Sequence, residues 1–326
     1  MDATDQPTAT AGRPLLQRLW DLPVHAAWLD PVAVRAADVV HAVEPRWLAD
    51  LLHGSWLGHP LHPLLAQGTV GLWSSAAVLD ALRSAGLVPS GRQDGVDAAS
   101  TVLVAAGTAA ALPTIAAGWT DYSDLHREQQ RIGLVHSSAN YTAGALFAAS
   151  LVARLRGRHG RGRVLGLLGF GVSGLGAALG THLSYRWAAG ANHAEGVPHR
   201  VPSGWYRVAL VDDLVESTPR RSEIGDVPVV VVRRGDDVRV LADTCSHLAG
   251  PLSQGSVSVE RGEACITCPW HGSTFRLSDG GVVHGPATAS QPTFQVRVDG
   301  RRQVLARLRP VRGVPVPPPA ATVVAD

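Results

Sequence analysis

Hydrophobic and polar positions change their pattern near residue 190. Before this point the chain holds four long apolar stretches that carry almost no charge and show no charged stripe at the 3.6-residue period of a soluble helix. Each is long enough to cross a hydrocarbon core of about 30 Å as a helix. The pattern predicts a four-helix transmembrane bundle, with a soluble Ala-rich bundle as the alternative. The expected spans are 64–82, 98–118, 132–153 and 164–185.

After residue 190 the pattern becomes that of β-structure. β-branched residues crowd the stretches 227–235 and 238–243, which predicts a hairpin, and a second hairpin is expected in 294–308. The predicted fold class is therefore multidomain, an α-helical four-helix transmembrane bundle followed by an all-β domain. The expected parts are an N-terminal segment at 1–49, the membrane domain at 50–187, a linker at 188–203, the β domain at 204–310 and a Pro-rich, disordered tail at 311–326.

Composition narrows the possible functions. The chain has 326 residues, a net charge of +2 and 17% charged residues, so nothing indicates a nucleic-acid partner. Three cysteines are too few for a disulfide framework, and all three lie in 245–268, which favours metal binding or redox chemistry. The first twenty residues lack the apolar core of a secretory signal.

The motif GHPLHPLL at 58–65 precedes the first expected span. Together with the order of the four spans, it resembles a family of small four-helix membrane domains of uncharacterised function. The resemblance covers about residues 50–190. It implies a multi-pass domain in contact with the lipid bilayer and implies no particular activity.

Arginines near the ends of the spans indicate an orientation. The link at 154–163 contains five arginines, and Arg83 and Arg92 lie on the same side of the expected bundle. The positive-inside rule places this side in the cytoplasm, so the termini and the β domain are expected on the outer side of the cell membrane. The opposite side has Arg46, Arg127, Arg131 and Arg186.

Four histidines lie near the ends of the expected spans, at the start of spans one and three and the end of span four. In an up-and-down bundle these positions share one membrane face, where the β domain also emerges. Axial ligation of a haem b, a proton or quinone site, and structural packing all fit such residues. The four are His59, His62, His136 and His182.

Cysteines and histidines of the β domain form two short clusters. A zinc site could use Cys265 and Cys268 with His247 or His271. The same Cys-x-x-Cys pair could be a redox dithiol, although that motif normally opens a helix. Alternatively, Cys245-x-His247 and Cys268-x-x-His271 each supply one thiolate and one imidazole, which suits a two-iron centre.

The residues around these clusters carry a second resemblance. CSHLAGPL at 245–252 and CPWHGSTF at 268–275 closely resemble the paired loops of Rieske domains, and GPA at 285–287 is similar to the third, proline-bearing loop that covers the cluster in that family. The resemblance spans about residues 200–310. It implies a Rieske-type [2Fe–2S] cluster held by Cys245, His247, Cys268 and His271, and single-electron transfer with a redox protein partner such as a reductase, an oxygenase or a respiratory component.

Three positions near the predicted ligands are expected to set the reduction potential. In quinol-oxidising members of the family, two further cysteines form a disulfide, and here the matching positions are Gly250 and Trp270. Ser273 matches a serine that donates a hydrogen bond towards the cluster, whereas Phe275 replaces a donating tyrosine. Fewer donors to the sulfurs predict a ferredoxin-like or intermediate potential. The predicted tuning residues are Ser273, Phe275 and Pro286 of the third loop.

Two classes of function follow. In the first, the chain is a membrane-anchored Rieske-type electron carrier whose helices serve as an anchor or docking surface. In the second, the helical domain is itself redox-active, with haem or quinol, and feeds the cluster within an oxidoreductase complex. A zinc-bound interaction module without redox activity is a remote alternative. Cys265 has no role in the resemblance and is expected to be a small strand residue.

Overall fold

The computed structural model of the chain describes residues 14–311, 313–315 and 317–319, so the predicted N-terminal segment and Pro-rich tail lie partly outside the described residues. Within these ranges the chain forms two compact units. Unit 1 comprises the described residues up to Val43 together with Pro63–Ala189, and unit 2 comprises Glu44–His62 together with the described residues from Gly190 onward.

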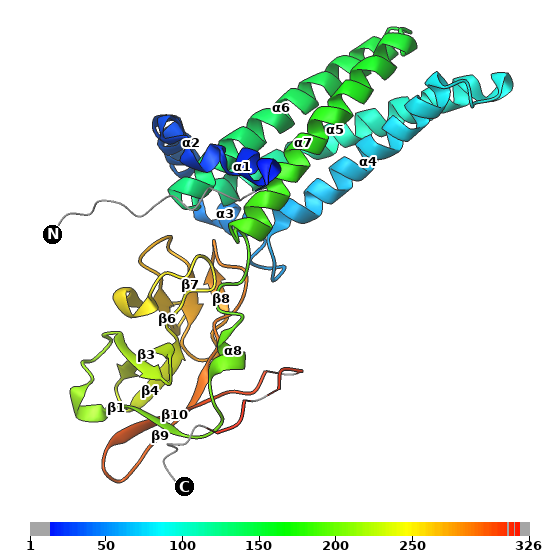
Figure 1. Ribbon diagram of the computed structural model, residues 1–326. Helices are drawn as coiled ribbons and strands as arrows, with labels where there is room; N and C mark the ends of the chain where they lie inside the picture. The colour runs from blue at the N-terminus through cyan, green and yellow to red at the C-terminus, as the bar shows by residue number, and fades with distance from the viewer. Residues whose placement is uncertain (1–13, 312, 316, 320–326) are drawn as a thin grey trace. The chain divides into compact units, whose positions relative to one another are not determined.

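Unit 1 is helical throughout. Its four long helices are joined by short connections and overlap the four stretches expected from the sequence (Figure 1). The predicted order of a helical region followed by an all-β domain is confirmed, although the helical region holds more than four helices. The helices of unit 1 are α1 (Leu15–Asp21), α2 (Asp30–Val43), α4 (Leu61–Ser84, whose first residues belong to unit 2), α5 (Gln93–Ser123), α6 (Arg127–Leu155) and α7 (His159–Arg186).

Two segments of the described chain, Ser90–Ser123 with α5 and His159–Arg186 with α7, are long and apolar enough to cross a membrane by length and composition. That α4, α5, α6 and α7 cross a membrane stays a prediction. Small residues let these helices approach closely: a Cβ added at Gly107 of α5 would lie 2.5 Å from the Trp73 ring of α4. Trp73 in turn stacks on Phe147 of α6, with ring centroids 4.2 Å apart.

A buried ion pair links the long helices near one end of unit 1. The Arg154 guanidinium of α6 pairs with the Asp80 carboxylate of α4, and these side chains are 0% and 2% exposed. Ser100 of α5 donates to Asp80 at 2.7 Å and accepts from Arg154 at 3.0 Å. Ser150 of α6 accepts from Arg154 at 3.1 Å and donates to the Gly162 carbonyl of α7 at 2.6 Å. The charges are therefore compensated within the bundle.

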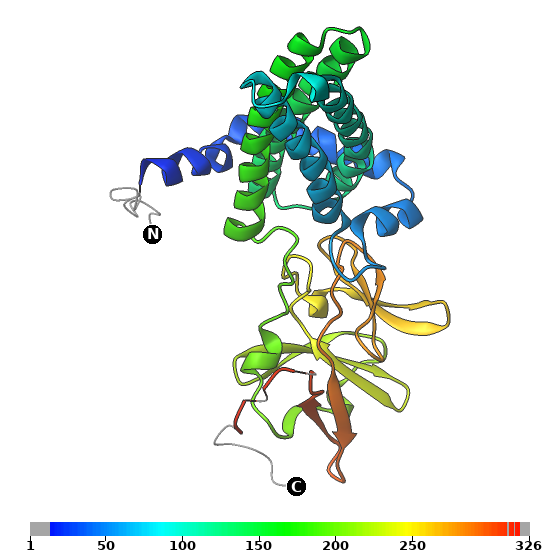
Figure 2. The same cartoon turned by 90° about the vertical axis from the view of Figure 1, so that its right-hand side faces the viewer.

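Unit 2 is built mainly from three antiparallel sheets, and Figure 2 shows its strands from a second side. The first has the order β1 (Tyr206–Leu210), β10 (Gln303–Leu308), β9 (Phe294–Val298). The second has the order β2 (Arg220–Ile224), β3 (Val227–Arg234), β4 (Asp237–Ala242). The third has the order β5 (Ser256–Glu260), β6 (Glu263–Thr267), β7 (Thr274–Arg276), β8 (Val282–His284). Both predicted hairpins, β3–β4 and β9–β10, are confirmed.

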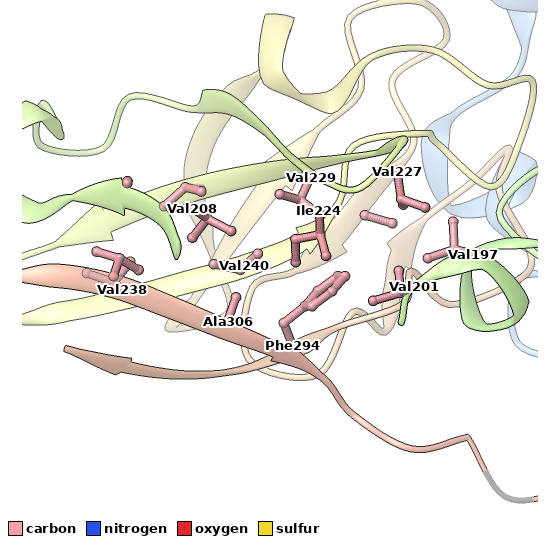
Figure 3. Packing of buried hydrophobic residues seen from close by; sticks show 14 of the residues in the cluster. Val197, Val201, Val208, Ile224, Val227, Val229, Val238, Val240, Phe294 and Ala306 are labelled. Atoms are coloured by element: carbon pink, nitrogen blue, oxygen red, sulfur yellow. The ribbon is translucent and has the colours of Figure 1, made fainter. Parts of the chain in front are cut away.

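Strand β3 separates two hydrophobic layers because its side chains alternate between its faces. Val229 and Val231 belong to the larger core, whose members Figure 3 shows gathered between the strands. Val230 and Val232 belong to the second core, which also contains Cys245 and Cys268. The run of four buried valines thus explains both the stability of this sheet and the support beneath the candidate site.

Two segments outside the sheets also join unit 2. The stretch expected to be a linker, 188–203, contains α8 (Val197–Arg200), and Val197 and Val201 are buried in the larger core. The second segment is 44–62, which contains α3 (Arg46–His53). α3 begins after Pro45 and ends at His53, and Gly54 forms its C-terminal cap in the left-handed conformation that glycine commonly adopts there.

Candidate metal centre

Two loops with similar backbone closure carry the predicted ligands. The first follows β4 and the second joins β6 to β7. In the first, the Cys245 N–H donates to the Gly250 carbonyl at 2.9 Å; in the second, the Cys268 N–H donates to the Ser273 carbonyl at 2.8 Å. The residue four positions after each cysteine has a positive φ, and its N–H donates to the carbonyl of that cysteine. These residues are Ala249 and Gly272. Each loop is therefore a tight turn that holds its cysteine at the base.

The sulfurs of the two loops meet in the second core. Cys245 and Cys268 are buried and hydrogen-bonded to each other. The hydrogen bond from Cys245 holds the pKa of the Cys268 thiol at about 7, against burial, which acts to raise it. Conversely, two effects raise the pKa of the Cys245 thiol well above its usual value. The hydrogen bond with Cys268 is the larger and burial is the smaller. A buried site of this kind holds two thiolates only when a cation compensates their charge.

Backbone N–H groups point at both sulfurs. The N–H of His247 donates to the Cys245 sulfur, and those of Trp270 and His271 donate to the Cys268 sulfur. Donors of this kind favour the thiolate over the thiol. The sequence spacing explains the arrangement, because each tight turn brings the amides after its cysteine back towards the sulfur.

The imidazoles of the two loops also meet. The rings of His247 and His271 lie edge to face with centroids 5.0 Å apart. In the described part of the chain, no group of three or more His, Cys, Asp or Glu side chains is placed to hold a single metal ion. A Rieske-type centre takes two protein ligands on each of its two irons. Two sulfurs and two imidazoles on facing loops are the donor set that such a centre requires.

The third loop supports this site through Ser273. The Ser273 hydroxyl accepts a hydrogen bond from the Ala287 N–H at 3.0 Å and contacts the Cys245 sulfur, and the serine is fully buried. Pro286 is buried in the same loop, next to Ala287. Phe275 is fully buried in the second core, with Cys245 and Cys268. The structure therefore brings all three predicted tuning residues to the site, and their effect on the potential stays a prediction.

Close packing at Gly250 ties the two loops together. A Cβ at this position would lie 2.8 Å from the Cys268 sulfur and 3.0 Å from the Trp270 ring. Gly250 and Trp270 match the two positions that carry a disulfide in quinol-oxidising Rieske domains. Here the Trp270 ring packs directly on Gly250. Trp270 is 49% exposed, so this contact also forms part of the surface beside His271.

Cys265 lies apart from these groups. It is fully buried in β6, opposite Ser258 of β5 and Arg276 of β7, and its thiol contacts the Glu263 carbonyl oxygen at 3.6 Å. Burial raises the pKa of the Cys265 thiol. The side chain therefore occupies a strand position, as the sequence indicates, rather than a loop position beside the predicted ligands.

The histidines of the membrane domain fall in different units. His59 and His62 belong to unit 2, whereas His136 and His182 belong to unit 1. His136 of α6 engages the Gly176 carbonyl of α7 through Nδ1 at 2.8 Å, and its Nε2 lies 3.1 Å from the Asn140 amide. The Trp187 indole donates to His182 Nε2 at 3.3 Å. These contacts are those of structural side chains, and that all four histidines share one membrane face stays a prediction.

Sequence reasoning missed one group of residues near the site. Asp50, Arg46 and Ser55, in and directly after α3, hydrogen-bond to residues 274–287. The start and end of α3 are recognisable from Pro45 and Gly54. No local pattern signals that the helix packs on a loop more than two hundred positions later.

The geometry fits a [2Fe–2S] group. Four features fit this group: the paired buried sulfurs, the N–H donors aimed at them, the two facing imidazoles and the close packing of Gly250 beside Cys268. Cys245, His247, Cys268 and His271 are the residues that would hold it.

Comparison with known families gives two matches along the chain. Residues 204–295 match the family model described as Rieske [2Fe–2S] domain, and residues 58–193 match the one described as predicted membrane protein (DUF2231). The combination agrees with the fusion expected from the sequence.

Comparison with curated proteins and solved structures finds ferredoxins. The chain is 33% identical over 95 residues to ferredoxin CarAc of Metapseudomonas resinovorans, covering 29% of this chain and 85% of that protein. It is 30% identical over 101 residues to the anthranilate 1,2-dioxygenase ferredoxin subunit of Burkholderia cepacia, covering 31% of this chain and 90% of that protein. A solved ferredoxin of carbazole 1,9a-dioxygenase from Nocardioides aromaticivorans IC177 shares 29% identity with a TM-score of 0.30, covering 33% of this chain and 100% of that one.

Proposed function

The chain belongs to the Rieske [2Fe–2S] family through residues 204–295, and we propose that it is a membrane-anchored electron carrier whose cluster is held by Cys245, His247, Cys268 and His271. One observation supports the proposal most directly. Two loops with the same pattern of backbone hydrogen bonds bring two buried sulfurs into contact and two imidazoles into contact. When bound, a [2Fe–2S] cluster supplies reversible one-electron transfer.

The residues of the site have separate roles in this function. Cys245 and Cys268 supply negative sulfur ligands, and the surrounding N–H groups stabilise that charge. His247 and His271 supply neutral ligands, which reduce the negative charge of the site and raise its potential relative to four cysteines. The half-exposed Trp270 beside His271 offers an apolar contact for a partner. The partner we propose is a redox protein such as a reductase, an oxygenase or a respiratory component, since two relatives are ferredoxins by name.

The helical unit acts as the anchor in this proposal. Residues 58–193 match a predicted membrane family, and α5 and α7 have the length and apolar character of spans. We propose that α4 and α6 cross as well, and that the Rieske domain lies on the outer side. The alternative of a redox-active helical unit gains no support from His136 and His182, because Gly176, Asn140 and Trp187 engage their ring nitrogens.

Iron, acid-labile sulfide and zinc content of the full-length protein in detergent, together with its EPR spectrum after reduction, test the cluster assignment. We expect about two irons and two sulfides per chain, and the EPR signature of a histidine-ligated cluster. Cys268→Ser should lose the cluster, whereas Cys265→Ser, the same change three positions earlier and inside β6, should keep it. Zinc without iron, or equal loss in both variants, would contradict the proposal.

A haem absorption band in the same preparation, lost in His136→Ala or His182→Ala, would instead support the redox-active helical unit. The absence of such a band, together with unchanged electron transfer in both variants, would leave the anchor as the role of the helices.

A further inference from the structure

Helix α3 and the two residues after it pack on the third loop of the candidate site, within unit 2. The Asp50 carboxylate receives one hydrogen bond from the last residue of β8 and one from the first residue of this loop. His284 donates through Nδ1 to Oδ2 at 2.7 Å, and the Gly285 N–H donates to Oδ1 at 2.8 Å. The side chains of His284 and Asp50 are only 14% and 25% exposed, so the contact is partly shielded from solvent. One carboxylate thus holds the end of β8 and the start of the loop.

Further contacts hold the same two segments together. The Ser55 hydroxyl donates to the Ala287 carbonyl at 3.3 Å. Gly285 leaves no room for a side chain, because a Cβ there would lie 2.9 Å from Ser55 Oγ and 3.0 Å from the ring of the buried His53. The helix end and the loop are therefore in direct contact on both sides of Pro286.

The loop in turn orients a hydroxyl at the predicted cluster ligand. The Ala287 N–H donates to Ser273 Oγ at 3.0 Å, and the Ser273 hydroxyl contacts the Cys245 sulfur. A hydroxyl has one proton and accepts through its lone pairs. Since Ser273 accepts from Ala287, its proton is directed to the sulfur. A donor to a cluster sulfur stabilises the added electron and raises the potential.

We propose that Asp50 is a positioning residue of the cluster site: by holding His284 and Gly285 it fixes Ala287, keeps the Ser273 hydroxyl on the Cys245 sulfur and so raises the reduction potential. The inference rests on the proposed function and adds to it a residue outside the Rieske sequence, in the segment that leads into the first long helix. It acts through Ser273 and does not touch the cluster.

Redox titration of the full-length protein in detergent tests this role. The EPR signal of the reduced cluster monitors the titration. Asp50→Ala should lower the midpoint potential, with the equilibrium constant for reduction falling about tenfold, as expected for one lost hydrogen bond to a charged group. Gly285→Ala should lower it too, because the added methyl group pushes the loop away from Ser55 and His53. Asp226→Ala is the matched control, since this carboxylate of unit 2 pairs with Arg200 and is exposed. Its potential should equal that of the unsubstituted protein.

A double-mutant cycle separates positioning from charge. In a Ser273→Ala background, Asp50→Ala should leave the potential unchanged, because the hydroxyl through which it acts is gone. An equal shift in both backgrounds, or no shift in either, overturns the proposal. If Asp50→Ala binds no iron, Gly285→Ala decides, and an unchanged potential there overturns it. Failure of the unsubstituted protein to bind a histidine-ligated cluster would instead contradict the proposed function itself.

Discussion

Cys265 and Cys268 are three residues apart in sequence but occupy different environments. Cys265 sits in the middle of β6 between two neighbouring strands, whereas Cys268 lies just past the strand end, in the loop that turns towards Cys245. A Cys-x-x-Cys spacing places both sulfurs on one centre only when a turn brings them together. Here the strand keeps the first cysteine away, so the two thiols have separate chemistry.

The raised pKa of Cys265 predicts a pH dependence of stability. Burial raises this pKa from its ordinary value of 9.0, so the folded chain keeps a proton that the unfolded chain releases at alkaline pH. The stabilising effect is complete below pH 9 and is lost as the pH rises through the higher folded value. As the pH rises above about 9, we expect the melting temperature of the protein to fall more steeply than that of Cys265→Ala. Parallel curves for the two proteins would show that this thiol does not titrate differently on folding.

At the level of elements, α3 depends on the glycine that ends it. Gly54 has a φ of +82°, and a Cβ there would lie 2.5 Å from the His59 carbonyl oxygen and 2.8 Å from the Leu61 nitrogen. Gly58 has a similar φ of +84° and open space around it. The two glycines therefore share the backbone conformation and differ in their surroundings.

Alanine at these two glycines separates backbone strain from crowding. Gly58→Ala should cost about 1–2 kcal/mol, the penalty of a left-handed conformation. Gly54→Ala should cost roughly 1–3 kcal/mol more, because the chain after the helix must also move. Thermal unfolding followed by tryptophan fluorescence measures the difference. Equal losses in the two variants would show that the tight approach of residues 59–61 relaxes freely.

The Asp80–Arg154 pair ties the long helices of unit 1 together. Arg154→Met would leave the Asp80 carboxylate buried without its partner, which should destabilise the unit by about 3–5 kcal/mol. Asp80→Leu combined with Arg154→Met removes both charges and should recover most of that loss. Thermal unfolding of the purified protein in detergent compares the three proteins. A double variant as unstable as Arg154→Met would mean that the pair contributes more than charge compensation.

Sequence reasoning reached the parts of the fold and site that depend on neighbouring residues. The β3–β4 hairpin follows from local patterning, and the ligand loops are recognisable because each holds its cysteine and histidine within four positions. Contacts between segments far apart in the sequence could not be predicted from local patterns. Arg154 looks like a loop arginine at the start of 154–163, yet α6 continues to Leu155 and turns this side chain into the bundle. Asp50 likewise looks like an exposed helical residue, because its partners lie in β8 and the loop after it.

On the scale of the whole molecule, the chain passes between its two units three times, near residues 43, 62 and 189. Unit 2 is therefore joined to the helical unit through both its early segment and its later domain. We therefore predict that the helices of residues 63–189 cross the membrane an even number of times, because residues 44–62 and the β domain belong to one unit.

The arginine distribution predicts which side that is. We expect the 154–163 link in the cytoplasm and unit 2 outside. Cysteines added by Gly160→Cys and Thr218→Cys, each in a Cys265→Ala background that keeps the buried Cys245 and Cys268, test this with a membrane-impermeant maleimide on sealed right-side-out vesicles. Both positions are exposed, and a Cβ at Gly160 meets no atom closer than 3.9 Å. Thr218→Cys should react at once and Gly160→Cys only after permeabilisation, and the reverse order would invert the orientation.

The placement of α3 also has a consequence for biosynthesis. The ribosome makes residues 44–62 before the four long helices, and the residues that Asp50 binds, His284 and Gly285, emerge only after nearly all of the chain has been translated. Residues 44–62 must therefore wait for these partners while the whole helical unit is translated. A chain whose translation stops before residue 284 carries the helices but leaves Asp50 without its two donors.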